Sequence, residues 1–190
     1  LACLGLNHKT APVEVRERFA VGNTKLGEAA RHLLETAGAA EGVVISTCNR
    51  TEFYLAAEDA GEAVKRLEVG LADKVHGHDG LYYRHESAQA VRHLCKVVSG
   101  LDSMLLGETE IFGQVKQAWS DFTREPSPLA HELSPWMQRL FQDAKEIRAR
   151  FLSGLGSASY GSQVRRLLGE PAAGATTLLV GAGQLAESIA

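Results

Sequence analysis

Cys48 is the residue whose type and surroundings point most directly to chemistry. It follows the apolar run 43–45, which is typical of a central strand, and Asn49 and Arg50 come directly after it. A side chain at the end of a strand can face a cleft while its backbone stays fixed. A guanidinium at Arg50 would favour the thiolate, the nucleophilic form of cysteine. Two interpretations stand: a nucleophilic thiol, or the small buried hydrophobe that a single cysteine beside a strand more often is.

Cys3 and Cys95 stand in apolar patterns, and we expect both in the core. The helical stripe that contains Cys95 also includes Ala88, Val91, Leu94 and Val98. His93 lies about half a turn from this stripe. It therefore faces either solvent or a cleft that contains Cys48, where an imidazole can act as acid or base. The chain has 3 cysteines and no Cys-x-x-Cys pair, which indicates neither a disulfide framework nor a metal site.

The run 99–114 mixes glycines, small polar residues and carboxylates in a way that a simple amphipathic helix does not need. A surface loop between helices would explain this composition. A polar site for a charged small molecule would also explain it, because Ser103, Glu108 and Gln114 could bind an ammonium group and hydroxyls.

A glycine motif follows the last apolar run of the chain. Gly181, Gly183 and Ala186 form Gly-x-Gly-x-x-Ala directly after residues 176–180, which we expect to form a buried strand. The glycines permit a tight turn and a close approach to a pyrophosphate, which the N-terminus of the next helix stabilises. The motif indicates the start of a dinucleotide-binding fold.

The elements that must position these residues follow from hydrophobic periodicity. We expect strands at 1–6, 42–47, 52–56 and 81–85, and helices from Pro12 onward, at 25–36 and at 62–75. This order suits an α+β catalytic domain with a ferredoxin-like βαββαβ sheet and added helices. A long amphipathic segment at 135–151 would form a connector helix. The predicted domains are therefore 1–134, the connector helices 135–170, and the truncated start of a Rossmann-type α/β domain at 171–190.

Composition limits the class of protein. The 190 residues are 45% hydrophobic and 23% charged, which is typical of a globular protein. No stretch approaches the roughly 20 apolar residues of a membrane span, so we expect a cytoplasmic protein with no membrane contact. The formal net charge of -3 does not by itself indicate a nucleic-acid partner.

Four segments, taken together, resemble the glutamyl-tRNA reductase family: residues 5–12 (GLNHKTAP), 46–52 (STCNRTE), 99–114 (SGLDSMLLGETEIFGQ) and 181–183 (GAG). Their order and spacing cover essentially the whole chain. The resemblance implies that a Cys48 thiolate attacks the ester carbon joining glutamate to tRNA(Glu), forming a thioester and releasing the tRNA. Hydride from NADPH then yields glutamate-1-semialdehyde, in the first committed step toward tetrapyrroles by the five-carbon route. A thioester suits this step because sulfur donates weakly into the carbonyl.

The family's site residues transfer by matching position. Cys48 and His93 match the residues important for catalysis. Glutamyl recognition is implied for Thr47, Asn49, Arg50, Ser103, Glu108, Thr109, Glu110 and Gln114. Arg50 would pair with the substrate's side-chain carboxylate in a bidentate manner. The cofactor segment comprises Gly181, Ala182, Gly183, Gln184, Leu185 and Ala186. The commonest family pattern has Pro-Gln where this chain has Thr109-Glu110, so the Glu110 carboxylate either meets the substrate ammonium or points outward.

The resemblance also implies partners. The full-length protein would be a homodimer that hands its aldehyde to glutamate-1-semialdehyde aminomutase. The rest of the cofactor domain and the C-terminal dimerisation domain are missing from this sequence, so we do not expect it to complete the hydride step alone. Two alternatives stay open: a non-catalytic tRNA-recognition module with a structural Cys48, and a fragment of a generic NAD(P)-linked dehydrogenase.

Overall fold

In the residues that it describes, the computed structural model contains a four-stranded sheet. It describes residues 1–22, 26–75, 77, 80–124, 133–153, 160–169, 176, 178–181 and 186. The strands are β1 (Ala2–Asn7), β2 (Glu41–Ser46), β3 (Arg50–Ala56) and β4 (Tyr83–Glu86). Their order in the sheet is β2-β3-β1-β4, and all three neighbouring pairs are antiparallel. With helices between β1 and β2 and between β3 and β4, this is the ferredoxin-like order that the sequence predicts.

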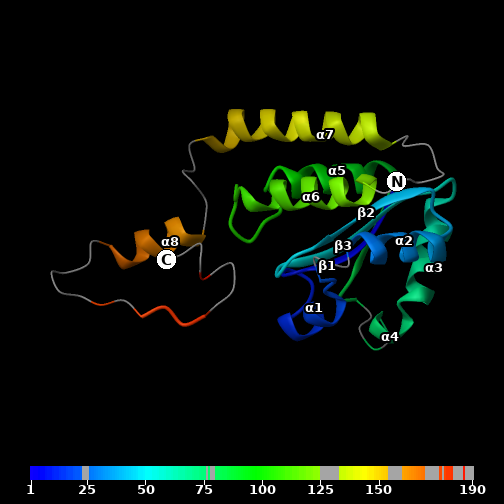
Figure 1. Cartoon of the computed structure of the whole chain (residues 1–190), viewed down its shortest axis with the longest axis horizontal. Helices are drawn as coiled ribbons and strands as arrows, with labels where there is room; N and C mark the ends of the chain where they lie inside the picture. Colours follow the sequence, from blue (N-terminus) through cyan, green and yellow to red (C-terminus); the bar gives the residue numbers. More distant parts are fainter. Residues whose placement is uncertain are drawn as a thin grey trace.

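Helices cover both sides of the sheet (Figure 1). Before β4 come α1 (Val13–Phe19), α2 (Leu26–Ala37), α3 (Ala60–Gly70) and α4 (Ala72–Val75). After β4 come α5 (Ser87–Val98), α6 (Glu110–Arg124), α7 (Leu133–Ile147), the π-helical turn η2 (Arg148–Leu152) and α8 (Tyr160–Leu168). In Figure 1, α5 and α6 lie on one side of the sheet with α7 outermost, whereas α1, α3 and α4 lie on the other. The single helix predicted at 62–75 is divided at Leu71, which is buried.

The sheet face toward α5 is polar, which is unusual for a buried surface. Side chains alternate between the two faces of a strand, so Arg50, Glu52 and Tyr54 of β3 lie on the same face. Asn7 pairs with Arg50 in the register, and Gly5 pairs with Glu52. The side chains of Asn7, Arg50, Glu52 and Tyr54 are each at most 3% exposed. The fold therefore encloses a polar layer between the sheet and α5.

The connector region packs more tightly onto the domain than a free connector would. Met137, Leu140 and Ala144 of α7 are buried in the same hydrophobic cluster as the sheet residues. Among the residues that the structure describes, no helix has the length and apolar character needed to cross a membrane.

The buried strand predicted at 176–180 is not observed. Of these residues the structure describes Thr176 and 178–180, and they form no strand. Leu178 and Val180 are 85% and 87% exposed. A strand requires a neighbour to satisfy its backbone groups, and no described strand pairs with this segment. The Rossmann-type domain therefore stays a prediction.

Candidate active site

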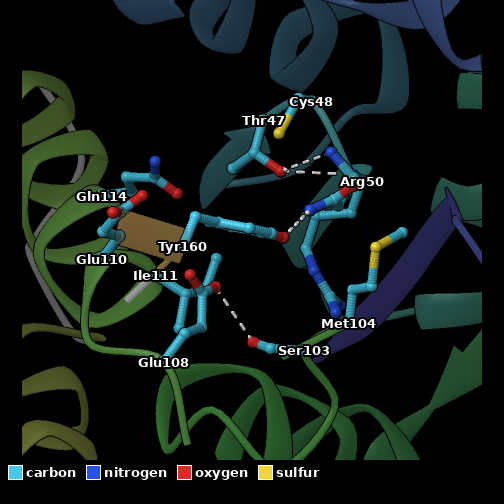
Figure 2. A pocket seen from close by; sticks show the side chains of 11 residues that line it. Thr47, Cys48, Arg50, Ser103, Met104, Glu108, Glu110, Ile111, Gln114 and Tyr160 are labelled. Carbon is cyan, nitrogen blue, oxygen red and sulfur yellow. Dashed lines mark hydrogen bonds between the residues drawn. The ribbon is translucent and has the colours of Figure 1, made fainter. Parts of the chain in front are cut away.

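A solvent-open cleft of about 330 Å³ surrounds Cys48. Three separate segments contribute to it: the β2–β3 turn, the 99–114 region and the start of α8. The residues lining it are Thr47, Cys48, Asn49, Arg50, Ser103, Met104, Glu108, Glu110, Ile111, Gln114 and Tyr160. Figure 2 shows the Cys48 side chain on one wall and Glu110 and Gln114 on the facing wall, with the Tyr160 ring between them. Of the residues predicted for glutamyl recognition, only the exposed Thr109 does not line the cleft.

The β2–β3 turn fixes the position of Cys48. The backbone N–H of Thr47 donates to the Arg50 carbonyl at 2.8 Å and closes the turn. The Thr47 hydroxyl accepts from the backbone N–H groups of Asn49 at 3.1 Å and of Arg50 at 3.2 Å. Such local side-chain bonds favour turns over continued strand. Cys48 therefore sits exposed at the tip of a hydrogen-bonded turn, which excludes the buried-hydrophobe alternative.

The electrostatics of the Cys48 thiol differ from the prediction. Partial burial raises the pKa of Cys48, and the charges of Glu108 and Glu110 raise it further, while Arg16 opposes them. The Arg50 guanidinium is 2% exposed and bonds to Glu52 and Asp102. The prediction that Arg50 favours the thiolate is therefore wrong, because its charge is already compensated by two carboxylates. In the free protein the thiol is protonated at neutral pH.

The opposite wall comes from the 99–108 loop and the first turns of α6. Gly100 and Gly107 both have φ of +79°, and the Gly107 N–H donates to the Gly100 carbonyl at 2.9 Å. The Ser103 hydroxyl donates to Glu108 at 3.1 Å. Burial raises the pKa of the Glu108 carboxyl, the neighbouring Glu110 raises it further, and the Ser103 hydrogen bond partly opposes the shift. This wall presents carboxylates to the cleft.

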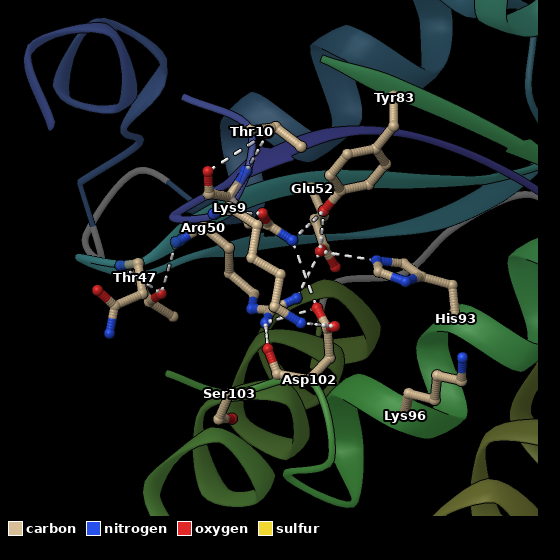
Figure 3. A network of polar contacts seen from close by, with 12 residues as sticks. Lys9, Thr10, Thr47, Arg50, Glu52, Tyr83, His93, Lys96, Asp102 and Ser103 are labelled. Carbon is tan, nitrogen blue, oxygen red and sulfur yellow. Dashed lines mark hydrogen bonds and ion pairs between the residues drawn. The ribbon is translucent and has the colours of Figure 1, made fainter. Parts of the chain in front are cut away.

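A buried network lies beneath the cleft and is centred on Glu52 (Figure 3). Glu52 accepts hydrogen bonds from Arg50 at 2.6 Å, Tyr54 at 2.7 Å, His93 at 3.0 Å and also from Tyr83. Burial acts to raise the pKa of the Glu52 carboxyl, but the His93 hydrogen bond and the Arg50 charge outweigh it and lower the pKa to about 2. The carboxylate is therefore ionised and acts as the shared acceptor of the network.

Arg50 links this network to the cleft. Its second terminal nitrogen donates to the Asp102 carbonyl at 2.6 Å and to the Asp102 carboxylate at 3.1 Å. Lys9 donates to the other Asp102 carboxylate oxygen at 2.6 Å. Both terminal nitrogens of the guanidinium are therefore committed to protein oxygens. The structure gives Arg50 no free fork with which to grip a substrate carboxylate.

Gly5 makes room for the network. It pairs with Glu52 on one side and with Tyr83 on the other. A Cβ at Gly5 would lie 2.7 Å from Cγ of Glu52 and 3.2 Å from a ring carbon of Tyr83. The glycine therefore lets the two side chains meet above its Cα atom.

His93 lies elsewhere than predicted. The buried face of α5 includes Ala90, Leu94 and Val97, and His93 is three residues from the first and four from the last, so it shares that face. Only 12% of its side chain is exposed. It faces neither solvent nor the Cys48 cleft: it bonds Glu52, and Figure 3 shows it at the opposite end of the network from Thr47. Cys95, predicted in the core, is only half-buried.

Sequence reasoning missed Met104, Ile111 and Tyr160 of the cleft. Tyr160 accepts a hydrogen bond from the Asn49 side-chain amide at 3.0 Å. It comes from α8, 111 residues further along the chain than Asn49. No local pattern around Tyr160 indicates a site, so only the folded chain reveals it.

Two residues of the predicted cofactor segment are described. Gly181 has φ of +148°, a conformation that side-chain-bearing residues rarely adopt, and a Cβ there would meet that of Ala186 at 3.4 Å. The positive φ agrees with the glycine that a dinucleotide motif requires at this position. Ala182, Gly183, Gln184 and Leu185 lie outside the described residues. Within the described part of the chain, no cluster of three or more His, Cys, Asp or Glu suits a metal ion.

Comparison with known proteins gives one consistent family. Residues 4–151 match the family model described as Glutamyl-tRNAGlu reductase, N-terminal domain. A glutamyl-tRNA reductase of Stenotrophomonas maltophilia (strain R551-3) is 43% identical over 187 residues, which cover 97% of this chain and 43% of that protein. One from Akkermansia muciniphila is 39% identical over 191 residues, covering 97% of this chain and 56% of the relative.

A solved structure agrees with this assignment. The glutamyl-tRNA reductase from Methanopyrus kandleri matches with a TM-score of 0.68 and 32% sequence identity, covering 88% of this chain and 39% of that chain. The chain thus spans about half the length, or less, of the proteins that it matches.

Proposed function

This chain belongs to the glutamyl-tRNA reductase family, and from that premise we propose that it carries the acyl-transfer site for reducing glutamyl-tRNA(Glu) to glutamate-1-semialdehyde. This reaction is the first committed step of tetrapyrrole synthesis by the five-carbon route. One observation carries the proposal: an exposed Cys48 on a rigid turn faces a cleft whose opposite wall is acidic. A substrate with an α-ammonium group beside a reactive ester complements that arrangement.

The proposed acyl transfer proceeds in one exchange at the ester carbon. The Cys48 sulfur loses its proton and forms a bond to the carbonyl carbon, and the bond to the ribose oxygen of the tRNA breaks. The proton passes to the leaving ribose oxygen. Glu108 is the cleft residue best suited to carry it, because its raised pKa lies closer to neutrality than that of an ordinary carboxyl. The products are a cysteinyl thioester and free tRNA.

Substrate recognition is divided between the two walls in this proposal. Glu110 lies on the acidic wall and receives the substrate ammonium. The donors for the side-chain carboxylate are the Asn49 and Gln114 amides, and the Thr47 hydroxyl lies on the same wall as Cys48. Arg50 contributes positive charge beneath the cleft floor instead of a bidentate contact, since Glu52 and Asp102 already occupy its terminal nitrogens.

His93 enters the proposal as a positioning residue. Its hydrogen bond to Glu52 helps to hold the carboxylate that in turn holds Arg50. A substitution at His93 would therefore slow the reaction by disturbing Glu52 and Arg50 beneath the cleft, although the imidazole does not contact the substrate.

The reducing half of the reaction needs NADPH, which supplies hydride when bound. The Gly181–Ala186 motif would hold its pyrophosphate, and the positive φ of Gly181 supports that assignment. In the full-length protein we propose a homodimer that passes the aldehyde to glutamate-1-semialdehyde aminomutase.

Release of tRNA from glutamyl-tRNA tests the proposal. We expect the 190-residue chain to release tRNA in a single turnover without NADPH, and Cys48→Ser to lose this release. Cys95→Ser is the matched control, because Cys95 is a half-buried thiol outside the cleft, and it should retain release. Equal release by Cys48→Ser would overturn the nucleophile assignment. Binding without release in the unsubstituted chain would instead indicate a tRNA-recognition module.

A further inference from the structure

Arg148 joins the connector region to the loop that carries the acidic wall. It is the first residue of η2, directly after α7 ends at Ile147. One terminal nitrogen donates to the carbonyls of Ser99 at 3.0 Å and Glu108 at 2.7 Å, and the other donates to the Gly107 carbonyl at 3.0 Å. A single guanidinium therefore satisfies three backbone oxygens from both ends of one loop.

The loop has a shape that depends on this guanidinium. Gly100 and Gly107 adopt positive φ and are hydrogen-bonded to each other. This pair forms the neck of the loop. A Cβ at Gly100 would lie 2.9 Å from the Glu108 carbonyl oxygen and 3.0 Å from a terminal nitrogen of Arg148. The guanidinium therefore occupies the space left by the missing side chain. Outside regular secondary structure, these carbonyls depend on Arg148 for partners that a helix or sheet would otherwise provide.

The 99–108 loop contributes residues that line the cleft and a residue that contacts Arg50 beneath it. Ser103 and Glu108 line the cleft and bond to each other. Asp102, between the two glycines, accepts from Arg50 through its carbonyl and its carboxylate. A displacement of the loop neck would therefore move the acidic wall relative to Cys48 and would disturb the partner of Arg50.

We propose that Arg148 is a positioning residue for the acyl transfer, which sets the placement of Glu108 and Ser103 against Cys48 by bonding the loop neck from the connector. This inference rests on the proposed function. The π-helical turn is consistent with such a role, because turns of this kind are frequent at functional sites. Lysine would not replace Arg148, since an ammonium lacks the planar fork that reaches carbonyls on both sides of the loop neck.

Arg150 provides a matched control. It lies two residues further along the same π-helical turn, is 68% exposed, and bonds the Glu146 carboxylate at 2.6 Å. Such exposed ion pairs contribute little to stability. Substitution of Arg150 therefore removes the same side chain from the same turn without touching the loop.

Single-turnover release of tRNA at saturating glutamyl-tRNA is the test. We expect Arg148→Lys and Arg148→Ala to lower the rate on the order of 100-fold with a smaller change in the substrate concentration at half-maximal rate, since misplacement by about 1 Å can have that effect. Added guanidinium should restore part of the rate to Arg148→Ala. Arg150→Ala should retain the rate of the unsubstituted chain.

A pH profile of Cys48 alkylation distinguishes positioning from a general loss of structure. Glu108 raises the pKa of the Cys48 thiol, so displacement of the loop in Arg148→Ala should shift the profile toward lower pH, and Arg150→Ala should not. Equal rates and equal profiles in the Arg148 and Arg150 variants would overturn the positioning role alone. Absence of tRNA release in the unsubstituted chain would overturn the proposed function itself.

Discussion

The substitution Glu52→Gln tests whether the buried carboxylate holds the polar layer together. Glutamine keeps the shape of the side chain but removes its charge. Arg50, which is 2% exposed, would lose the carboxylate that lies 2.6 Å from it and keep Asp102 as a charged partner. Tyr54 and His93 donate to different carboxylate oxygens of Glu52. A glutamine amide has a single acceptor oxygen, so one of the two donors would lose its acceptor. We therefore expect a large loss of stability with little change in the fold.

The magnitude follows from the pKa of Glu52. A carboxyl held at about 2 in the folded chain, against an ordinary value of 4.5, contributes about 3 kcal/mol to the free energy of unfolding at neutral pH. Removing one partner of a buried ion pair typically costs about 3–5 kcal/mol, which agrees. Because the folded pKa is the lower one, this contribution is present above pH 4.5 and is lost as the pH falls toward 2.

Urea unfolding of the two proteins at several pH values measures the effect. We expect Glu52→Gln to be less stable by about 3 kcal/mol at pH 7, with the difference shrinking as the pH falls from 4.5 toward 2. Glu146→Gln is the control, because Glu146 is 54% exposed and pairs with the exposed Arg150. The reasoning would be refuted if both variants lost the same stability at pH 7, or if the Glu52→Gln difference did not change with pH.

Three further changes have defined outcomes. Gly5→Ala places a Cβ 2.7 Å from Cγ of Glu52, and we expect it to lower the free energy of unfolding by about 1–3 kcal/mol; an unchanged urea midpoint would contradict this. Because burial, the largest cause, raises the pKa of the Cys48 thiol above its ordinary value, the midpoint of its alkylation by iodoacetamide should lie at a higher pH than that of a cysteine in an unfolded peptide; a midpoint at lower pH would contradict the raised pKa. Tyr160→Phe removes the acceptor of the Asn49 amide at 3.0 Å, so the KM for glutamyl-tRNA should rise several-fold in a release assay; an unchanged KM would show that this hydrogen bond does not orient Asn49.

Local patterns were enough to predict the sheet and the position of Cys48. The apolar run of β2 and the polar turn after it are adjacent in sequence, so a cysteine at the end of a strand could be inferred without knowledge of the fold. Whether this cysteine is exposed or buried stayed open until the structure showed it exposed. The strand predicted at 81–85 is observed at Tyr83–Glu86. Its start was misplaced because the residue types of β4 differ little from those of the turn before it.

The direction of Arg50 could also have been predicted from the sequence. Arg50, Glu52 and Tyr54 are spaced by two residues in a strand, which places all three on one face. A guanidinium and a carboxylate on the same buried face pair with each other before they meet a ligand. Proximity to Cys48 in sequence suggested the opposite, but Cys48 lies in the turn before β3 and is not part of the strand.

The remaining contacts depend on residues far apart in the chain. Tyr160 reaches Asn49 from 111 residues away, and Arg148 reaches Ser99 from 49 residues away. His93 bonds Glu52 from another element of the fold. Periodicity shows which face of a helix is apolar, but not which partner that face meets, so these contacts require the folded structure.

Mass spectrometry of Cys48 tests the central claim most directly. The 190-residue chain would be incubated with glutamyl-tRNA in the absence of NADPH, and the peptide that contains Cys48 would then be analysed. The account predicts that this peptide gains the mass of one glutamyl group, and that hydroxylamine removes it, as expected for a thioester. An unmodified Cys48 after the substrate has released its tRNA, or a glutamyl group on a different residue, would contradict it.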